Sequence, residues 1–289
     1  MGNQKEDLWT VLRMLEWATD YFKKEEIPDP RLSIEWLLAD VLSCKRLDLY
    51  LSYERPLSPT ELDQLRPMIK RRASHEPLQY IIGYTDFMNC RIEVNPSVLI
   101  PRIETEQLVE LLLDMTASRH HEALKLLDIG TGSGCIPIAI KHKVPVWNCS
   151  GMDISREALK CAKKNSELNN FEVAFFEGDL FKSDHPGIAG DDWDIIISNP
   201  PYIQSGERTA IQKQVSKFEP KNALFHENPT EVYQSITEFA STHNASLFLE
   251  LNDRLAPEIF DVVNSMYKRV KLHKDLDNNP RFISAFPDR

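Results

Sequence analysis

The 289-residue chain lacks the features that mark membrane, secreted and metal-binding proteins. No hydrophobic run approaches the roughly 20 residues that span a bilayer, and the first residues contain no apolar signal-peptide segment. The five cysteines are scattered, without a C-x-x-C pair or a neighbouring histidine cluster, which predicts reduced thiols in a cytoplasmic protein and no metal site. Negative charge exceeds positive charge, with 44 Asp and Glu residues against 34 Lys and Arg residues. The formal net charge of −10 disfavours non-specific binding to polyanions, so neither a membrane nor a nucleic acid is expected as a direct partner.

Residues 1–84 are predicted to form a small helical domain. Apolar and neutral side chains recur at helical spacing along one stripe near its start: Leu8, Leu12, Leu15, Thr19 and Phe22. Two further helix starts are indicated by Asp29 before Pro30 and by the capping box Ser58–Glu61. Pro67 is expected to kink or interrupt the helix that follows, and the basic run Lys70–Arg72 is expected to be a solvated helix face. Because no chemically reactive set occurs in this part, we predict a recognition element.

Residues 85–97 are predicted to form a β-hairpin linker, since short extended segments flank Asn89. From Thr105 onward, helical and strand patterns alternate, which is typical of a mostly parallel sheet with helices on both faces. The two closely spaced strand patterns "VKLH" and "RFISAF" near the end predict an antiparallel last strand. The fold class of residues 98–289 is therefore α/β.

The stretch "LLDIGTGSGC" predicts a ligand-binding turn between a buried strand and a helix. It contains Asp128 and the consecutive turn residues Gly130, Thr131, Gly132, Ser133 and Gly134. Glycines let the backbone bend tightly and approach a ligand closely. The third glycine comes one residue too early for the G-x-G-x-x-G pattern of dinucleotide sites, and an acidic residue before the turn favours a cationic ligand over a pyrophosphate.

Aspartates follow three successive strand patterns, at Asp128, Asp153 and Asp179. Asp153, with Ile154 after it, stands about 20 residues beyond the first strand, where such folds hold ribose hydroxyls. Asp179, with Leu180 after it, can accept a hydrogen bond from an adenine amino group or shape the base pocket. A single aspartate of this kind is usually only a polar strand terminus. Three of them beside a glycine turn predict a site for a sulfonium nucleoside.

The stretch "DWDIIISNPPYI" places a rigid polar loop directly after a buried strand. Proline has no backbone N–H and cannot continue a central strand, so the strand is expected to stop at Asn199. Pro200 and Pro201 then hold Asn199 and Tyr202 in a fixed loop at the strand end. An ordinary turn is the alternative explanation of this motif.

"GTGSG" together with "NPPY" resembles the class I S-adenosylmethionine-dependent methyltransferases that act on planar amino groups. "EPLQYIIGYTDFMNCRIEVNPSVLIPRIETEQLVE" (Glu76–Glu110) and "FEPKNAL" (Phe218–Leu224) are similar to the PrmC/HemK family, the peptide-chain release factor glutamine methyltransferases. The resemblance covers nearly the whole chain. It implies a Rossmann-like sheet of seven strands in residues 98–289, S-adenosyl-L-methionine as cofactor, and release factors as protein substrates, methylated on N5 of the glutamine in a Gly-Gly-Gln motif.

The chemistry explains why the strand would end in prolines. A carboxamide nitrogen is a poor nucleophile, so catalysis must position it in line with the methyl donor and stabilise the charge that develops on it. The side-chain oxygen of Asn199 and the carbonyl oxygen of Pro200 can accept its two N–H bonds, and Tyr202 offers a flat face to the planar amide. We therefore predict Asn199, Pro200, Pro201 and Tyr202 as catalytic residues, with Asn199 also bordering the cofactor.

The sequence leaves four points open. An N6-adenine methyltransferase of DNA or RNA would use the same loop on a flipped base but would need a basic groove. A catalytically inactive cofactor-binding protein is the other alternative, although its motifs would be expected to decay. Arg102 and Glu106 can line the cofactor mouth or form a junction ion pair. Asn252-Asp253 and Pro280 depart from the family pattern, which leaves the exact protein substrate open, and the chain is expected to be a monomer.

Overall fold

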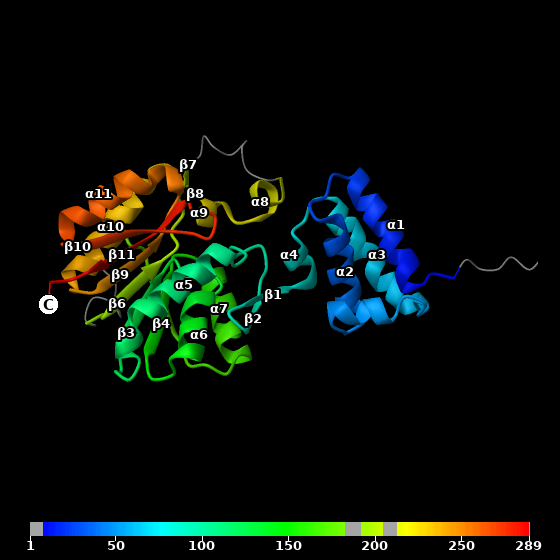
Figure 1. Ribbon diagram of the computed structural model, residues 1–289, viewed down its shortest axis with the longest axis horizontal. Coiled ribbons are helices and arrows are strands. Elements are labelled where there is room, and N and C mark those ends of the chain that lie inside the picture. The colour runs from blue at the N-terminus through cyan, green and yellow to red at the C-terminus, as the bar shows by residue number, and fades with distance from the viewer. Residues whose placement is uncertain (1–7, 183–191, 205–212, 289) are drawn as a thin grey trace, which may run out of the picture. The chain divides into compact units, whose positions relative to one another are not determined.

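The computed structural model describes residues 8–182, 192–204 and 213–288. They fall into two compact units, shown in Figure 1. The first contains residues up to Gly83 together with the short helix α8 (Lys213–Phe218), although α8 lies far along the chain from the rest of that unit. The second unit begins at Tyr84 and contains the remaining elements.

The first unit is helical. Its elements are α1 (Val11–Lys24), α2 (Pro30–Val41), η1 (Arg46–Leu51), α3 (Pro59–Ala73) and α4 (Leu78–Ile82), besides α8. One apolar core joins them, and its fully buried members include Leu15, Phe22, Ile34, Leu38 and Leu65. Burial of one helix face against this core stabilises helices of this length, which are marginal alone.

The predicted stripe of the first helix is wrong at its first position. The helix begins after Thr10, whose hydroxyl accepts a hydrogen bond from the Arg13 N–H, so Leu8 precedes the helix and is exposed. The buried face instead consists of Val11, Met14, Leu15, Ala18 and Phe22. Of the predicted stripe, Leu15 and Phe22 are buried, whereas Leu12 and Thr19 are half-buried.

The helix starts at Asp29 and Ser58 differ in their caps. Ser58 and Glu61 exchange both hydrogen bonds of the predicted capping box, which is confirmed. Asp29 occupies the N-cap position before Pro30, but its backbone is left-handed (φ 48°) and its side chain makes no capping bond. Proline at the first helical position, and not the aspartate side chain, favours the start of α2.

Two expectations about α3 are wrong in part: Pro67 does not interrupt the helix, and Lys70 and Arg71 are exposed as predicted whereas Arg72 is not. The helix runs without interruption through Pro67, because Leu65 and Ile69 on either side are buried in the core. Arg72 does not belong to a solvated face: it is buried and donates hydrogen bonds to the Ser33 hydroxyl (3.0 Å), the Glu76 carbonyl (2.9 Å), the Pro28 carbonyl (3.2 Å) and the Gln214 side chain (3.1 Å). Burial lowers the pKa of the Arg72 guanidinium to about 10.

The second unit is built on a seven-stranded sheet of order β10-β11-β9-β6-β3-β4-β5. Its strands are β3 (Lys125–Ile129), β4 (Asn148–Asp153), β5 (Ala174–Glu177), β6 (Ile195–Ser198), β9 (Ser246–Glu250), β10 (Arg269–Lys274) and β11 (Pro280–Phe286). Five neighbouring strands are parallel, and β11 runs antiparallel to both β9 and β10. The predicted α/β class with an antiparallel last strand is confirmed.

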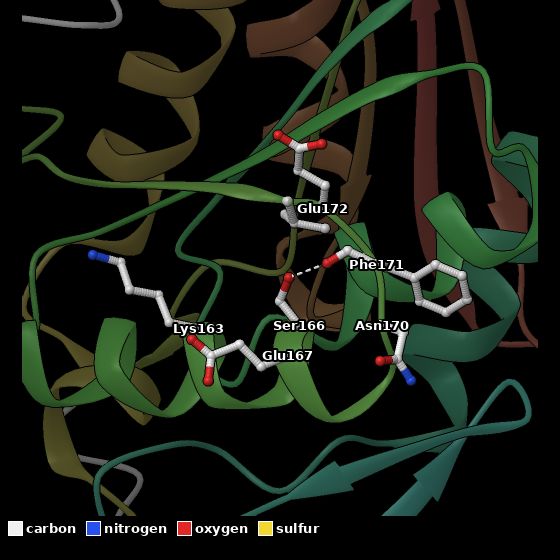
Figure 2. A pocket seen from close by; sticks show the side chains of 7 residues that line it. Lys163, Ser166, Glu167, Asn170, Phe171 and Glu172 are labelled. Carbon is white, nitrogen blue, oxygen red and sulfur yellow. Dashed lines mark hydrogen bonds between the residues drawn. The ribbon is translucent and has the colours of Figure 1, made fainter.

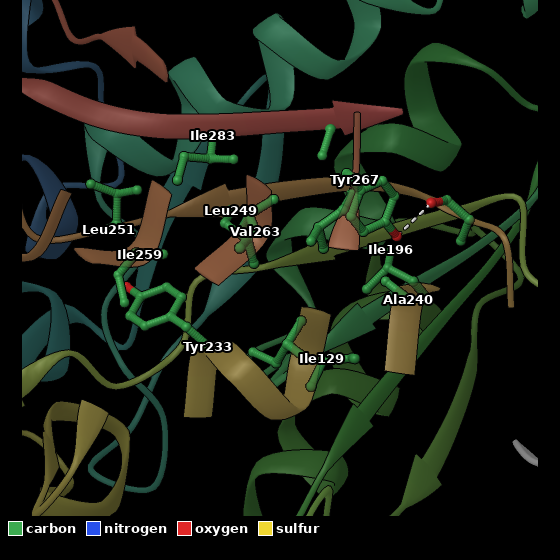
Figure 3. Packing of buried hydrophobic residues seen from close by; sticks show 14 of the residues in the cluster. Ile129, Ile196, Tyr233, Ala240, Leu249, Leu251, Ile259, Val263, Tyr267 and Ile283 are labelled. Atoms are coloured by element: carbon green, nitrogen blue, oxygen red, sulfur yellow. Dashed lines mark hydrogen bonds between the residues drawn. The ribbon is translucent and has the colours of Figure 1, made fainter. Parts of the chain in front are cut away.

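Helices cover both faces of this sheet. One face carries α5 (Ile103–Met115), α6 (Cys135–Lys143) and α7 (Arg156–Leu168), and the other carries α10 (Pro229–Thr242) and α11 (Ala256–Met266), as Figure 1 shows. Figure 3 shows the second layer, where Tyr233, Ile259 and Val263 pack against Ile196 and Leu249 of the sheet. The buried strands β6 and β9 read as continuous apolar runs because helices cover them on both sides.

The predicted hairpin is present as β1 (Tyr84–Phe87) and β2 (Cys90–Glu93). Met88 and Asn89 at its tip both have positive φ (48° and 68°), as the tight two-residue turn of a hairpin requires. Sequence patterns did not reveal α10, nor the small parallel pair β7 (Ile203–Gln204) and β8 (Phe225–His226) that ties the loop after β6 to the "FEPKNAL" segment. Among the described residues, no helix combines the length and the apolar character needed to cross a membrane.

Candidate functional site

The sheet topology brings the predicted site residues to one edge. The chain leaves β3 for β4 and β5 on one side and then returns to β6 on the other side of β3. Ligands of such sheets bind at the carboxyl ends of the strands where the order reverses. The glycine turn follows β3 and the segment Asn199–Tyr202 follows β6, so the two motifs leave neighbouring strands at this point.

The glycine turn is open where a ligand can approach and packed where it meets the protein. Gly130, Gly132 and Gly134 all have positive φ (77°, 54° and 77°). A Cβ added to Gly130 or Gly132 would meet nothing within 4 Å, whereas one on Gly134 would lie 3.0 Å from Ala162 Cβ of α7. The first two glycines therefore leave free space, and the third permits close packing of the turn.

Asp153 holds the turn in place. Its carboxylate accepts the N–H of Gly132 (2.9 Å) on one oxygen and the N–H of Ser155 (2.8 Å) on the other. Each carboxylate oxygen keeps acceptor capacity beyond these bonds. Burial raises the pKa of Asp153, and Ile154 directly after it is exposed. Asp153 therefore links the ends of β3 and β4 and stays available to a donor on a ligand.

Among the described residues, Asp128 is a buried carboxylate that lacks a cationic partner. Its two oxygens and the nearby Thr131 hydroxyl are buried without a hydrogen bond of standard geometry in this part of the chain, and the Thr131 hydroxyl offsets the effect of burial on the Asp128 pKa only in part. Burial raises the pKa of Asp128 to about 7. A buried charge of this kind is costly unless a cation or donor compensates it. The environment of Asp128 thus fits a cationic ligand with N–H donors.

Asp179 lies farther beyond the end of its strand than predicted. β5 ends at Glu177, and the Asp179 carboxylate accepts the N–H of Phe181 (3.1 Å) and pairs with Lys182 (3.1 Å). Leu180 packs against the core below the site. The structure brings Asp128 and Asp153 close enough for their charges to interact. The adenine role of Asp179 stays a prediction.

The loop after β6 begins one residue earlier than expected. β6 ends at Ser198, whose hydroxyl donates to the Ile129 carbonyl (2.6 Å) and joins the two strand ends. Pro200 is buried, and Tyr202 packs against the core of the second unit. Burial raises the pKa of Tyr202, so its hydroxyl stays protonated at neutral pH. Asn199 is half-buried at the edge.

Two residues that the sequence reasoning did not single out hold Asn199. Its Nδ2 donates to the hydroxyl of Thr105 (3.0 Å), which in turn donates to the Glu250 carboxylate (2.8 Å) at the end of β9. Thr105 and Glu250 are both buried. Thr105 lies within the stretch Glu76–Glu110 that resembles the PrmC/HemK family, which was a signal for its importance. Nothing local in the sequence linked either Thr105 or Glu250 to Asn199.

Arg102 and Glu106 do not pair with each other. Arg102 forms an ion pair with the buried Glu219 (2.5 Å), which belongs to the "FEPKNAL" segment. Glu106 accepts the backbone N–H of Met88 (2.7 Å) and fixes the tip of the hairpin. Of the two open alternatives, a junction ion pair between these two residues is thus wrong, because each has another partner within the second unit.

Two family descriptions match consecutive parts of the chain. The "PrmC N-terminal domain" matches residues 13–83, and the "Methyltransferase small domain" matches residues 104–220. A release factor glutamine methyltransferase of Geobacter sulfurreducens is 39% identical over 221 residues, covering 76% of this chain and 75% of that protein. One of Chlorobaculum tepidum is 33% identical over 289 residues, covering 97% and 98%. This chain belongs to the release factor glutamine methyltransferase family.

A solved structure supports the fold of this family member. The catalytic domain of hMettl16 in complex with the MAT2A 3'UTR hairpin 6 aligns with a TM-score of 0.53 over 76% of this chain and 81% of that chain. Its sequence identity is 18%, so the likeness concerns the fold alone. The resemblance to the PrmC/HemK family inferred from the motifs is confirmed by the relatives that match nearly the full chain.

A separate groove of about 580 Å³ lies away from this edge (Figure 2). Its lining, which includes Lys163, Glu167 and Glu172, comes from α7 and from the loop between α7 and β5. Parallel strands begin at the edge opposite their carboxyl ends, so the groove is at the far edge of the sheet from the glycine turn. Within it the Ser166 hydroxyl donates to the Phe171 carbonyl, a local loop contact.

Gly151 in β4 supports the glycine turn from below. A Cβ at this position would lie 2.6 Å from the Thr131 hydroxyl and 2.9 Å from its Cβ and Cγ2. Replacing Gly151 with alanine is expected to destabilise this protein by about 1–3 kcal/mol, as overpacking does. It is also expected to weaken cofactor binding, because the glycine turn is displaced. Denaturant unfolding and calorimetry measure the two effects.

The matched control is the same substitution in a Thr131→Gly background. All three contacts involve the Thr131 side chain, so its removal should relieve the additional loss of stability. An equal loss in both backgrounds would show that the contact with Thr131 is not the cause.

Proposed function

We propose that this protein transfers the methyl group of S-adenosyl-L-methionine to the side-chain amide nitrogen of the glutamine in the Gly-Gly-Gln motif of peptide-chain release factors. The proposal rests on the fixed orientation of the Asn199 side-chain amide. Its Nδ2 is committed to Thr105, which leaves Oδ1 as an acceptor at the ligand edge of the sheet. The relatives' shared name supplies the protein substrate.

The cofactor supplies an electrophilic methyl group on a sulfonium. The residues proposed to hold it lie at or after the carboxyl ends of β3, β4 and β5: Asp128, Gly130, Thr131, Gly132, Ser133, Gly134, Asp153, Ile154, Asp179 and Leu180. Asn199 after β6 borders this site without holding the cofactor in place. The buried oxygens of Asp128 suit the cofactor's cationic amino-acid end, and Asp153 suits the ribose hydroxyls. Open space at Gly130 and Gly132 supports a close approach of the ligand to the backbone.

The residues after β6 are proposed to prepare the substrate nitrogen. Asn199 Oδ1 and the Pro200 carbonyl accept the two amide N–H bonds, which orients the nitrogen lone pair toward the methyl group and stabilises the positive charge that develops on nitrogen. Pro200 and Pro201 restrict the backbone, so these acceptors need no ordering when substrate binds. Tyr202 is proposed to lie against the amide plane. The nitrogen loses one of its two protons to solvent as it gains the methyl group, so no residue in this set has to change its protonation state.

The helical unit is proposed to recognise the release factor, because the chemistry-bearing residues all belong to the second unit. The net charge of −10 favours a protein partner over nucleic acid. A monomer in the cytoplasm, where release factors act on ribosomes, is the state proposed for the enzyme.

Mass spectrometry of a release factor incubated with this protein and isotope-labelled S-adenosyl-L-methionine tests the proposal. A single labelled methyl group is expected on the glutamine of the Gly-Gly-Gln motif. A release factor with that glutamine replaced by alanine is the matched control and should stay unlabelled. Adenine-containing DNA and RNA serve as competing substrates.

Label on nucleic acid in place of the release factor would refute the substrate and revive the adenine alternative. No label on any of them, with cofactor binding intact, would support the inactive alternative and overturn the proposal.

A further inference from the structure

We propose that Thr105 and Glu250 are positioning residues that decide which end of the Asn199 carboxamide faces the substrate, and that protonation of Glu250 reverses that choice. The inference rests on the proposed function, because it assigns Asn199 the task of accepting a hydrogen bond from a substrate amide. It adds that the protonation state of Glu250 regulates the same site.

Three side chains form a chain of two hydrogen bonds, called the relay below. Asn199 follows β6, Thr105 lies in α5 and Glu250 ends β9. Asn199 Nδ2 lies 3.0 Å from Thr105 Oγ1, and Thr105 Oγ1 lies 2.8 Å from Glu250 Oε2. Thr105 and Glu250 are 3% and 1% exposed, so water does not compete for these bonds. Thr105 is the only hydrogen-bond partner of either the Asn199 or the Glu250 side chain among the described residues.

The ionised form of Glu250 specifies one direction of the relay. A carboxylate can only accept hydrogen bonds, and a threonine hydroxyl has a single hydrogen to donate. That hydrogen goes to Glu250, so the Thr105 oxygen must accept, and only the Nδ2 of Asn199 can donate to it. Oδ1 is then turned to the other side, where it can accept the N–H of a substrate amide.

The protonated form permits the opposite direction. A carboxylic acid can donate its own hydrogen to the Thr105 oxygen, which frees the hydroxyl hydrogen for Asn199. Thr105 then donates to Oδ1 of a carboxamide rotated by half a turn. Nδ2 faces the substrate in that state, and two N–H donors oppose each other where an acceptor is needed. Methyl transfer is therefore expected to require ionised Glu250.

The surroundings of Glu250 bring its titration near neutral pH. Burial raises the pKa of Glu250 to about 7, while the bond from Thr105 lowers it. The charged or titratable groups that face it are Glu104 and Arg102 at the start of α5, Arg281 of β11, Tyr202 and Tyr233. Neither arginine neutralises it directly, since Arg102 pairs with Glu219 and Arg281 with Asp275 (3.2 Å).

The first test is the pH dependence of kcat at saturating cofactor and release factor. In the wild-type protein, kcat is expected to rise with pH through a midpoint near the pKa of about 7 of Glu250. A glutamine at position 250 can donate or accept, so Glu250→Gln should lower kcat and remove this midpoint. An unchanged midpoint in a folded Glu250→Gln variant would overturn the proposal.

Substitutions of Thr105 separate positioning from packing. Thr105→Val keeps the shape but loses both hydrogen bonds, and kcat is expected to fall about tenfold with KM for the release factor nearly unchanged. Thr105→Ser restores the hydroxyl and should recover most of the rate. The matched control is Thr116→Val, which removes another buried hydroxyl of the same helix, bonded to the Leu112 carbonyl (2.7 Å), away from the sheet edge. Equal losses for Thr105→Val and Thr116→Val would contradict the positioning role.

The second test needs no turnover. In protein labelled with ¹⁵N-asparagine, the side-chain NH₂ signal of Asn199 is identified by its loss in Asn199→Ala. It is expected to shift with pH with the midpoint found for kcat, and to lose that shift in Glu250→Gln. A pH-dependent signal in a protein that methylates no release factor would contradict the proposed function but support the relay. An Asn199 signal that does not change between about pH 5 and pH 8 would overturn the relay itself.

Discussion

Replacing Asn199 with alanine is expected to lower the rate of methyl transfer by about 10²–10³-fold, the loss typical for removal of one fixed hydrogen-bonding group aimed at developing charge. The affinity for S-adenosyl-L-methionine should be nearly unchanged. Asn199 is attached to the relay through Nδ2 and not to the glycine turn or to Asp153, so its removal leaves those groups in place. The kcat for a release factor and the calorimetric dissociation constant of the cofactor measure the two quantities.

The effect should belong to kcat more than to KM, because the bond from the substrate amide strengthens as positive charge develops on nitrogen. Asn148→Ala is the matched control. Asn148 is an exposed asparagine at the start of β4, on the edge of the sheet opposite the site, and its loss should change neither quantity. Parallel losses of rate and cofactor affinity in Asn199→Ala would instead assign Asn199 to cofactor binding.

Replacing Asp128 with asparagine is expected to have two effects of opposite sign. Cofactor affinity should fall roughly 10- to 100-fold, since a hydrogen bond to a charged group contributes about 1.5–3 kcal/mol. The stability of the cofactor-free protein should rise at alkaline pH, since the variant no longer has to bury a charge that lacks a cationic partner among the described residues. Calorimetry gives the affinity, and thermal unfolding at several pH values gives the stability.

The sign of the pH effect follows from the raised pKa. Burial raises the pKa of the folded Asp128 from 3.8 to about 7, so the folded state binds a proton that the unfolded state has already released. The resulting stability is fully present below the unfolded pKa and is lost as pH rises through about 7. The advantage of Asp128→Asn over the wild type should therefore grow between these two pH values and level off above them.

Asp194→Asn provides the control for this experiment. Asp194 lies at the start of β6, where its carboxylate accepts the Lys125 N–H (3.0 Å) and faces Arg119 (3.6 Å). Its replacement should leave cofactor affinity unchanged and lower stability, because it loses a partnered carboxylate. A stability profile of Asp128→Asn that follows the wild type at every pH would show that Asp128 is not the buried charge described above.

Local chemistry made part of this structure predictable. The Ser58–Glu61 capping box, the hairpin around Asn89 and the end of β6 before two prolines all depend on interactions within a few residues. The backbone requirement at each of these positions selects a narrow set of residue types, so the type predicts the conformation. The same reasoning failed at Pro67 and Arg72, where burial in the helical core outweighs the local preference.

The sequence by itself determined the α/β class, the glycine turn, the rigid loop after β6 and the family resemblance, because each follows from residue type and spacing along the chain. Only the tertiary structure decided which distant side chains meet. Asn199 and Thr105 are 94 residues apart, Thr105 and Glu250 are 145 apart, and Arg102 and Glu219 are 117 apart. These contacts, and the burial of Asp128, arise from the crossing of the chain through a parallel sheet, which brings strand ends together regardless of their separation in sequence.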